Sequence, residues 1–429
     1  ESQRVRALEI SGTPGGDGGG VVLDALAGAV VDMAGNPSAP LLGFIVVETH
    51  DSVLPTITSA ELFLGTGVLK VTASETIDVT PTTRVNQTGL LVDNGVTPTG
   101  TAVGLARWIR LVGSTVAVGA KDGVVFTVHL TEQQRVHAVA LSNTQGGDGS
   151  VTWLDVDPNA VQDMAGNLIV HDDNNPMVEH ADVIHPVVQF ANVNYSTGVV
   201  VVSVSETVDA TPIQNIDLNK MYLVNQSSSH PAMMDLVGAG VLSLDGVTTT
   251  ITLTELQRVS AIAMSGTPGG DGVANVMTFM GASFQDIATN PVVETHNVVV
   301  NETLDSVRPF SRTATLDFND GTLVLTGSET IDSTPPTKVL PSRFYLLNDN
   351  TVATTINRVV QLDAASPVTA LDGYTLTITL TEPQRVQALE ISNTPGGDET
   401  GAVLLETFDG AFMDVGENPS LHIEQIPVV

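Results

Sequence analysis

Short apolar runs, broken by Gly, Pro, Asn and Thr, follow one another along the whole chain. Many of them alternate apolar and polar positions, which is typical of strands with one buried face, and the density of Gly, Pro and Thr excludes a long helix. In residues 51–181 the pattern predicts seven or eight strands, at 59–64, 67–74, 89–93, 102–112, 123–130, 150–156 and 167–171, with 114–118 left open. Strands of this length and spacing predict an all-β sandwich.

One short helix is expected after the strand that ends near residue 130. Residues 131–134 read Thr-Glu-Gln-Gln, a capping box with Thr131 as N-cap and Gln134 three residues on, and 254–257 and 381–384 repeat it. Val136 and Val139 then lie on one face of the helix, and a Gly-rich turn ends it. A second helical turn is expected at 27–32.

The chain is built from an internal repeat. Gln-Arg-Val recurs every 123 to 131 residues, with its arginine at Arg4, Arg135, Arg258 and Arg385. An aspartate closing the Gly-rich turn follows each time, at Asp17, Asp148, Asp271 and Asp398. A further aspartate opens a turn that ends in asparagine, at Asp32, Asp163, Asp286 and Asp414. Ser-Glu-Thr-(Ile/Val)-Asp occurs at 74–78, 205–209 and 328–332. Such periodicity predicts a tandem array.

The motif positions divide the chain into three complete repeats and part of a fourth. We expect Ig-like repeats at 51–181, 182–304 and 305–429, with 1–50 as the C-terminal part of another. Residues 1–50 are expected to supply a helix and up to two strands, too few to bury a sandwich core. Neighbouring repeats of a longer chain would complete them in cis, or a second copy of the chain in trans. Either arrangement predicts self-association or continuation into a linear filament.

The order Ser-Glu-x-(Val/Ile)-Asp, a Thr-rich strand (TLTITLTE at 375–382) and Asp-x-Ala-Gly-Asn resembles a known module. It is similar to the tandem bacterial-type Ig-like repeats of giant secreted surface proteins, of the cyanobacterial motility or the algal and stramenopile surface and mastigoneme shaft type. The turns at 286–290 and 414–418 depart modestly from it. The resemblance implies tandem immunoglobulin-like β-sandwiches, each with one short helix. It also implies an extracellular structural protein forming the shaft of a cell-surface or flagellar filament.

Charge and composition exclude several classes of function. Lys and Arg number 16 and Asp and Glu 48, a net charge of −32, so nucleic acid is not an expected partner. The chain has no cysteine, and therefore neither disulfides nor thiolate metal sites. No apolar run is long enough to span a bilayer, so no direct membrane insertion is expected.

Catalytic motifs are missing from the sequence, and no enzyme activity is expected. Neither a Gly-x-Ser-x-Gly elbow nor a phosphate-binding loop with its lysine occurs, and the histidines do not recur at one repeat position. His180 and His185 are more typical of a solvated linker than of a zinc site. Trp108 and Trp153 are interpreted as core residues rather than as platforms for a ligand.

Calcium is the one candidate ion, because hard cations bind clustered carboxylates. Residues 155–163 imitate the start of a Ca²⁺ loop through Asp155, Asp157, Asn159 and Asp163, but lack its glycine and final glutamate. The acids that recur in the repeats are Glu75, Asp78, Glu206, Asp209, Glu329 and Asp332, together with the aspartate that opens each asparagine turn. Turn capping and metal binding both remain open for them. The linker acids Glu48, Asp51, Glu179 and Asp182 would clamp neighbouring repeats through an ion and stiffen the array.

Glycans are the remaining candidate ligands. N-glycosylation sequons begin at Asn86, Asn194, Asn225 and Asn301, and they become informative if a eukaryote secretes the protein. The alternative function is a calcium-stiffened adhesin that binds glycans or another cell. The repeat at 51–181 would carry that role, because it holds both tryptophans and the loop at 155–163.

Overall fold

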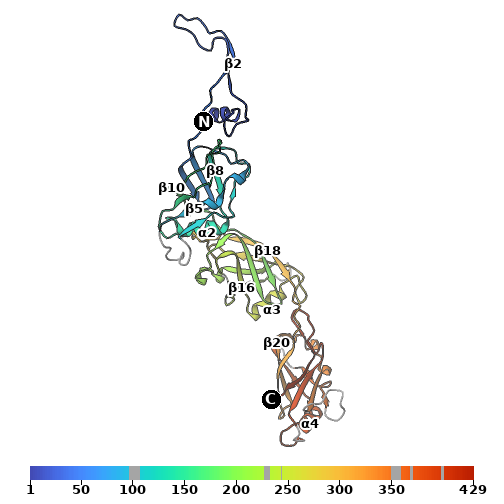
Figure 1. Ribbon diagram of the computed structural model, residues 1–429. Helices are drawn as coiled ribbons and strands as arrows, with labels where there is room; N and C mark the ends of the chain where they lie inside the picture. Colours follow the sequence, from blue (N-terminus) through green and yellow to red (C-terminus); the bar gives the residue numbers. More distant parts are fainter. Residues whose placement is uncertain (96–106, 227–231, 243, 349–358, 368–370, 398–400) are drawn as a thin grey trace. The chain divides into compact units, whose positions relative to one another are not determined.

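The computed structural model describes residues 1–95, 107–226, 232–242, 244–348, 359–367, 371–397 and 401–429. Its contacts divide the chain into two compact units, which are described separately. The first comprises Glu1–His185 with Gln285–Asn290, and the second comprises Pro186–Phe284 with Pro291–Val429. Strands dominate both units (Figure 1).

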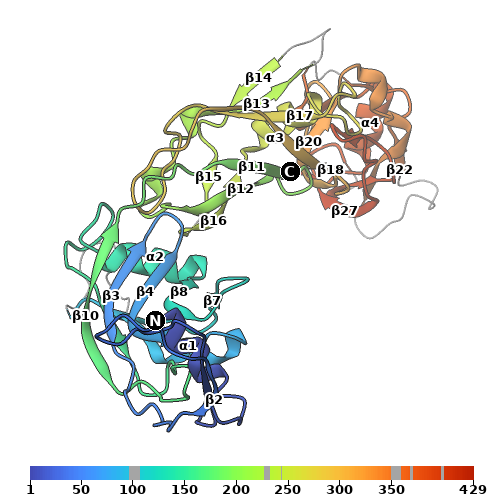
Figure 2. The ribbon, with the colours of Figure 1, turned by 90° about the horizontal axis from the view of Figure 1, so that it is seen from above.

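The first unit contains a β-sandwich of eight strands among its described residues. They are β3 (Ile57–Phe63), β4 (Val68–Ile77), β5 (Leu90–Asp93), β6 (Trp108–Arg110), β7 (Thr115–Val116), β8 (Gly123–His129), β9 (Trp153–Val156) and β10 (Asp172–His180). Their order is β6-β5-β9-β10-β3-β4-β8-β7. β10 pairs antiparallel with β9 through its first half and parallel with β3 through its second half, so it passes from one sheet to the other. Figure 2 shows β3 and β4 side by side.

The core of this sandwich follows from alternation along the strands. Ala60, Val71 and Phe126 are partners across three neighbouring strands, and all three are buried. The core is mostly Val, Leu, Ile and Ala, in a chain of which only 4% of the residues are Phe, Trp or Tyr. The period of two therefore places one face of each strand inside and the other in solvent.

Each complete copy of the capping box starts a helix, as predicted. The helices are α2 (Glu132–Leu141), α3 (Glu255–Ala263) and α4 (Glu382–Glu390). In α2 the Thr131 hydroxyl accepts from the Gln134 backbone N–H at 3.3 Å, and the Gln134 side chain accepts from the Thr131 N–H at 2.9 Å. The same glutamine donates to the Val112 carbonyl at 2.9 Å, which ties the helix start to the sheet.

The second unit contains two further sandwiches. The first has β11 (Val188–Asn194), β12 (Val199–Val208), β13 (Met221–Asn225), β14 (Ala232–Asp235), β15 (Gly240–Val241), β16 (Gly246–Thr252), β17 (Asn275–Phe279) and β18 (Thr295–Thr303). The other has β19 (Ser311–Asp317), β20 (Thr322–Asp332), β21 (Phe344–Asn348), β22 (Val359–Gln361), β23 (Ser366–Pro367), β24 (Gly373–Thr379), β25 (Val403–Thr407), β26 (Met413–Asp414) and β27 (Ile423–Pro427). β18 repeats the sheet-changing course of β10. Each sandwich encloses its own apolar cluster.

Single 3₁₀ turns link the sheets at equivalent places. They are Thr82–Arg84, Gln87–Gly89, Ile213–Asn215, Leu218–Lys220, Pro336–Lys338 and Pro341–Arg343. The chain is therefore all-β, with tandem immunoglobulin-like sandwiches that each carry one short helix.

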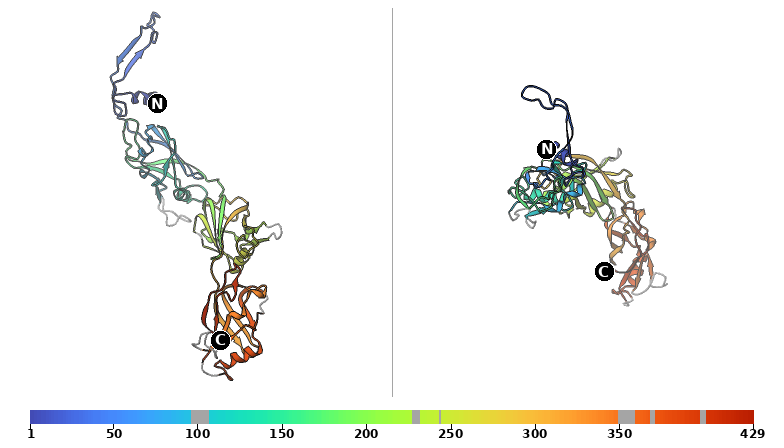
Figure 3. Two further views of the ribbon diagram at one scale, coloured as in Figure 1. Left: turned by 90° about the vertical axis from the view of Figure 1, so that its right-hand side faces the viewer. Right: turned by 45° about the horizontal axis from the view of Figure 1, so that its top comes forward.

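Residues 1–50 hold α1 (Ser2–Glu9) and the strands β1 (Val22–Ala25) and β2 (Leu41–Ile45), as predicted. Figure 3 shows β1 and β2 as a two-stranded ribbon. No apolar side chain of 1–50 is buried; Leu23, Leu42 and Phe44 are each more than half exposed.

Four local predictions were wrong. Residues 167–171 form no strand; the strand of this region is β10, whose polar sequence Asp-Asp-Asn-Asn-Pro hides its alternation. Residues 27–32 form turns around Gly28, whose positive φ interrupts a helix.

Trp108 is 43% exposed on β6, and Trp153 is half-buried on β9, so neither lies in the core. His180 ends β10 rather than lying in a linker. Part of the strand expected at 102–112, and Asp398, lie outside the described residues.

Candidate functional site

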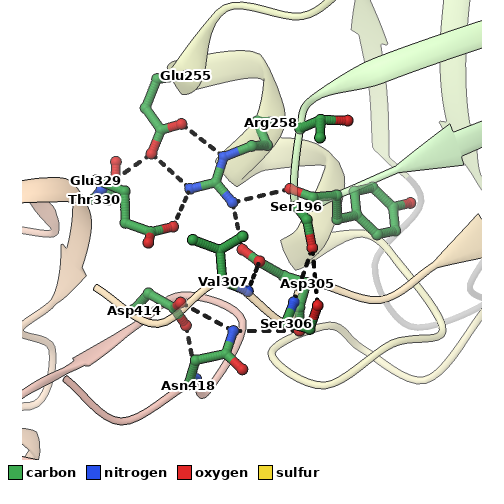
Figure 4. A network of polar contacts seen from close by, with 12 residues as sticks. Ser196, Glu255, Arg258, Asp305, Ser306, Val307, Glu329, Thr330, Asp414 and Asn418 are labelled. Carbon is green, nitrogen blue, oxygen red and sulfur yellow. Dashed lines mark hydrogen bonds and ion pairs between the residues drawn. The ribbon is translucent and has the colours of Figure 1, made fainter. Parts of the chain in front are cut away.

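The repeated arginine is the centre of a buried polar network in the second unit (Figure 4). Arg258 donates from Nε to Glu255 at 2.6 Å, from Nη1 to Asp305 at 2.5 Å and from Nη2 to Glu329 at 3.0 Å. Nη1 also donates to the Tyr195 carbonyl at 3.1 Å. The arginine side chain is only 6% exposed. Its guanidinium therefore holds three carboxylates that are far apart in the sequence.

The fold brings these groups together from different repeats. Arg258 and Glu255 lie on α3, whose start is fixed by the Thr254 capping box. Asp305 lies in the segment after β18, and Glu329 lies on β20 of the following sandwich. The other oxygen of the Glu255 carboxylate accepts the Thr330 backbone N–H at 3.0 Å. Charged and backbone contacts thus join α3 to β20 across the repeat junction.

The Asp–Asn turn at residues 414–418 contributes a further carboxylate to the network. Asp414 accepts the Asn418 backbone N–H at 2.8 Å and its side-chain amide at 3.0 Å. The same amide donates to the Asp305 carbonyl at 3.3 Å. Turn capping, one of the two interpretations of the repeated acids, therefore applies to this aspartate. The cap also positions its carboxylate in the junction.

Three carboxylates of this junction form an acidic cluster. Asp305, Glu329 and Asp414 each contribute an oxygen, and these oxygens lie within 4.8 Å of one another. Burial raises the pKa of Glu329 to about 7, and the nearby Asp414 charge adds to the increase. Burial likewise raises the pKa of Asp414 to about 6, against the hydrogen bonds from Asn418. The cluster therefore attracts positive charge, either protons or a cation.

The first unit repeats the arrangement. Arg4 on α1 donates to Glu1 at 2.8 Å, to Asp51 at 2.6 Å and to Glu75 on β4 at 3.0 Å. Asp51, Glu75 and Asp163 again place carboxylate oxygens within 4.8 Å of one another. Burial raises the pKa of Glu75, and the charges of Asp163 and Asp51 add to the increase. Glu75 is 6% exposed, and its Oε1 is buried without a hydrogen-bond partner.

The Gly-rich turn packs against the Asp–Asn turn of the following repeat. A Cβ added to Gly269 would lie 1.8 Å from the Val415 carbonyl oxygen, and one added to Gly15 would lie 2.1 Å from that of Met164. Side chains are thus excluded at these positions, besides the positive φ that both glycines adopt. The sequence correctly indicated that the turn ends the helix, but not this second contact.

The structure does not bring the four candidate residues of 155–163 together. Asp155 lies on β9 and accepts the Asn174 backbone N–H at 2.7 Å, and Asp157 pairs with Arg110 at 2.6 Å. Asn159 adopts a positive φ of 67°, while Asp163 belongs to the junction cluster. Consecutive residues of this segment face different surroundings, so spacing in the sequence was a poor guide to proximity.

The recurring acids separate into two roles. Glu75 and Glu329 enter the clusters, and Glu206 is buried at the equivalent place on β12. The aspartates three residues later take other partners, which are Arg84 for Asp78, Asn215 for Asp209 and Lys338 for Asp332. These aspartates tie the strand to the neighbouring 3₁₀ turn.

The four linker acids have two kinds of partner. Glu48 and Glu179 accept backbone N–H groups of their own repeats, from Gly12 at 2.8 Å and from Asn143 at 2.9 Å. Asp51 belongs to the cluster described above, and Asp182 accepts from Arg135 at 2.6 Å. Only the aspartates of these pairs therefore contact a junction arginine.

The sequons differ in their surroundings. Asn86 and Asn301 are exposed, and Asn194 is half-buried. Asn225 is 2% exposed, and its amide donates to the Met264 carbonyl at 2.7 Å and to Asp271 at 2.8 Å. A glycan on that nitrogen is incompatible with both contacts. Asn86, Asn194 and Asn301 stay glycosylation candidates.

The contacts of the junction arginines were not predicted from the sequence, in which Gln-Arg-Val stood out only as a repeat marker. A usable signal was present, because Asp51, Asp182 and Asp305 follow their arginines by 47 residues. Glu75 and Glu329 follow Arg4 and Arg258 by 71 residues. A basic residue and two acids with constant spacing in successive repeats indicate a contact between repeats.

Comparison with known proteins gives no family for this chain. No protein-family description matches it, and no curated protein matches it. Solved structures with Ig domains align with it at low similarity. Titin domains A168–A170 have 8% identity and a TM-score of 0.19, with 88% of this chain and 100% of the titin chain covered. The four N-terminal Ig domains of Dscam1 isoform 8.4 have 12% identity and a TM-score of 0.15, with 88% and 77% covered.

Helices offer no route through a membrane in the part of the chain that is described, since none is long and apolar enough to cross one.

Proposed function

We propose that this protein is an extracellular structural repeat protein. Its Ig-like repeats, at 51–181, 182–304 and 305–429 with a partial repeat at 1–50, form the shaft of a cell-surface or flagellar filament of the mastigoneme type. The observation that carries the proposal is the buried Arg258 network, in which one repeat's helix binds the linker and the first sheet of the next.

The repeated motifs of the sequence support this role because they meet at a junction. Arg258 and the Gly-rich turn at Gly269 come from one repeat, and Glu329 and the turn at Asp414 come from the next. Residues that serve only the fold of a single sandwich would not need partners in the following copy. A net charge of −32 adds repulsion between neighbouring shafts, which favours separate filaments over bundles.

Electron microscopy of the native particle tests the proposal. We expect filaments whose axial period is a multiple of one repeat. Particles that remain isolated monomers, with neither axial nor lateral contacts, would overturn the proposal.

The second candidate function is the glycan-binding adhesin. One observation favours it. Trp108 on β6 and Trp153 on β9 both pair with Asp93 of β5, the strand between them, so the two indoles lie on one incompletely buried sheet face. Indole faces of this kind bind sugars through apolar contact. On a glycan array, binding that is lost in Trp153→Ala would support the adhesin, and an array without signal would remove it.

A further inference from the structure

We propose that the acidic junction cluster of the first unit, formed by Asp51, Glu75 and Asp163, binds one divalent cation of the Ca²⁺ class. The cluster of the second unit, formed by Asp305, Glu329 and Asp414, has the same residue types at the same positions of the repeat, and we expect it to bind the same ion. The inference does not depend on the filament, because it concerns the junction within each unit. It adds a mechanism that fastens consecutive repeats.

The first argument is the balance of charge. Around Arg258 lie four carboxylates, those of Glu255, Asp305, Glu329 and Asp414, so with all four ionised the network carries an excess of three negative charges over this arginine. Carboxylates withdrawn from water require a counter-charge, and their mutual repulsion grows as the local dielectric falls. A divalent ion removes most of the excess in one step. Around Arg4 the same four-to-one ratio recurs with Glu1, Asp51, Glu75 and Asp163.

The second argument is an unpartnered oxygen. Glu75 Oε1 is buried and accepts no hydrogen bond, although the other oxygen of this carboxylate binds Arg4 at 3.0 Å. Leaving a buried acceptor without a partner is unfavourable, and more so when the acceptor is charged. Because the Glu75 carboxylate belongs to the cluster, a cation there would supply the missing partner.

The ligand chemistry selects the ion. Both clusters offer carboxylate oxygens and neither includes histidine, which disfavours transition metals. Ca²⁺ accepts irregular sets of oxygen ligands at about 2.3–2.6 Å and completes its shell with water, whereas Mg²⁺ demands near-ideal octahedral geometry. Asp163 and Asp414 are held in place by their asparagine turns, so part of each site is organised beforehand.

Native mass spectrometry of the full chain, stripped with chelator and titrated with CaCl₂, tests the proposal. Glu75→Gln and Glu329→Gln should each bind one ion fewer than the wild type, and the double variant two fewer. Glu382→Gln is the matched control, because Glu382 also binds an arginine, Arg385, but lies in neither cluster. It should bind as many ions as the wild type. Equal ion counts in the wild type and the double variant would overturn the proposal.

Thermal unfolding separates a metal ligand from a structural partner of arginine. In CaCl₂ the double variant should melt below the wild type, because it has lost bound ions. In chelator it should melt at or above the wild type, because it carries less repulsion. The same decrease in both buffers, or no effect of CaCl₂ on the wild type, would contradict the inference. MgCl₂ at the same concentration should give the smaller increase.

Discussion

Arg258 and Arg385 occupy the same position of the repeat but have different surroundings. Arg258 is buried among Glu255, Asp305 and Glu329, whereas Arg385 pairs with Glu382 at 2.6 Å and donates to the Phe318 carbonyl at 2.7 Å. When a buried carboxylate loses the arginine that pairs with it, its negative charge is left without compensation. The two arginines therefore separate the role of the junction from the role of the helix.

We expect Arg258→Gln to lower the free energy of unfolding by about 3–5 kcal/mol, because it leaves buried carboxylates unpaired. Urea denaturation in chelator measures the loss. Arg385→Gln is the control and should produce a much smaller change. Equal losses in the two variants would mean that the arginine acts through its own helix rather than through the junction.

Only part of the site could be predicted from single residues in the sequence. The capping role of the turn aspartates was predictable, because Asp163 and Asp414 cap backbone groups within four residues of themselves. Glu75 was a candidate only because it recurs, and its partners Asp51 and Asp163 lie 24 and 88 residues away in the chain. Proximity of that kind is set by the pairing of sheets, which residue spacing within one loop does not encode.

At the scale of elements, the capping box fixes where each helix starts. Thr254→Ala removes the acceptor of the Gln257 backbone N–H, and we expect a loss of about 1 kcal/mol in the free energy of unfolding. Chemical denaturation checks it, with Thr248→Ala on the exposed face of β16 as the control, expected to change stability by less than about 0.5 kcal/mol. A larger effect in the control would point to strand propensity instead.

The Gly-rich turn gives a second prediction at this scale. Gly269 and Gly272 have nearly the same φ, +84° and +86°, but only Gly269 approaches another turn, at Val415. Gly269→Ala and Gly272→Ala therefore carry the same backbone strain and differ in the steric clash. We expect Gly269→Ala to lower the melting temperature several degrees further than Gly272→Ala. Identical melting temperatures would show that the turn does not need its contact with the following repeat.

Elements were predictable to the extent that their signals are local. The capping boxes, and strands such as β4 and β8, come from alternation and hydrogen bonding within a few residues. β10 was missed because its polar first half pairs with β9 and its second half with β3. Its burial is thus divided between two sheets, and no single period describes it.

For the whole molecule, charge makes the clearest prediction. With a net charge of −32, the full chain should not retard duplex DNA in a gel even at low salt, where electrostatic attraction is strongest. A basic DNA-binding protein is the positive control. Retardation that disappears as salt rises would contradict the prediction and indicate a local basic surface.

The sequence alone determined that this protein is a tandem β-rich repeat with capped short helices and a strongly acidic surface. Periodicity, capping and net charge are properties of neighbouring residues or of simple sums, so they need no coordinates. Only the tertiary structure decided that Arg4 and Arg258 each face three acids, that two kinds of turn pack together, and that both tryptophans lie outside the core. Those outcomes depend on which sheet faces meet across a junction, and that pairing is fixed by the packing of whole sandwiches.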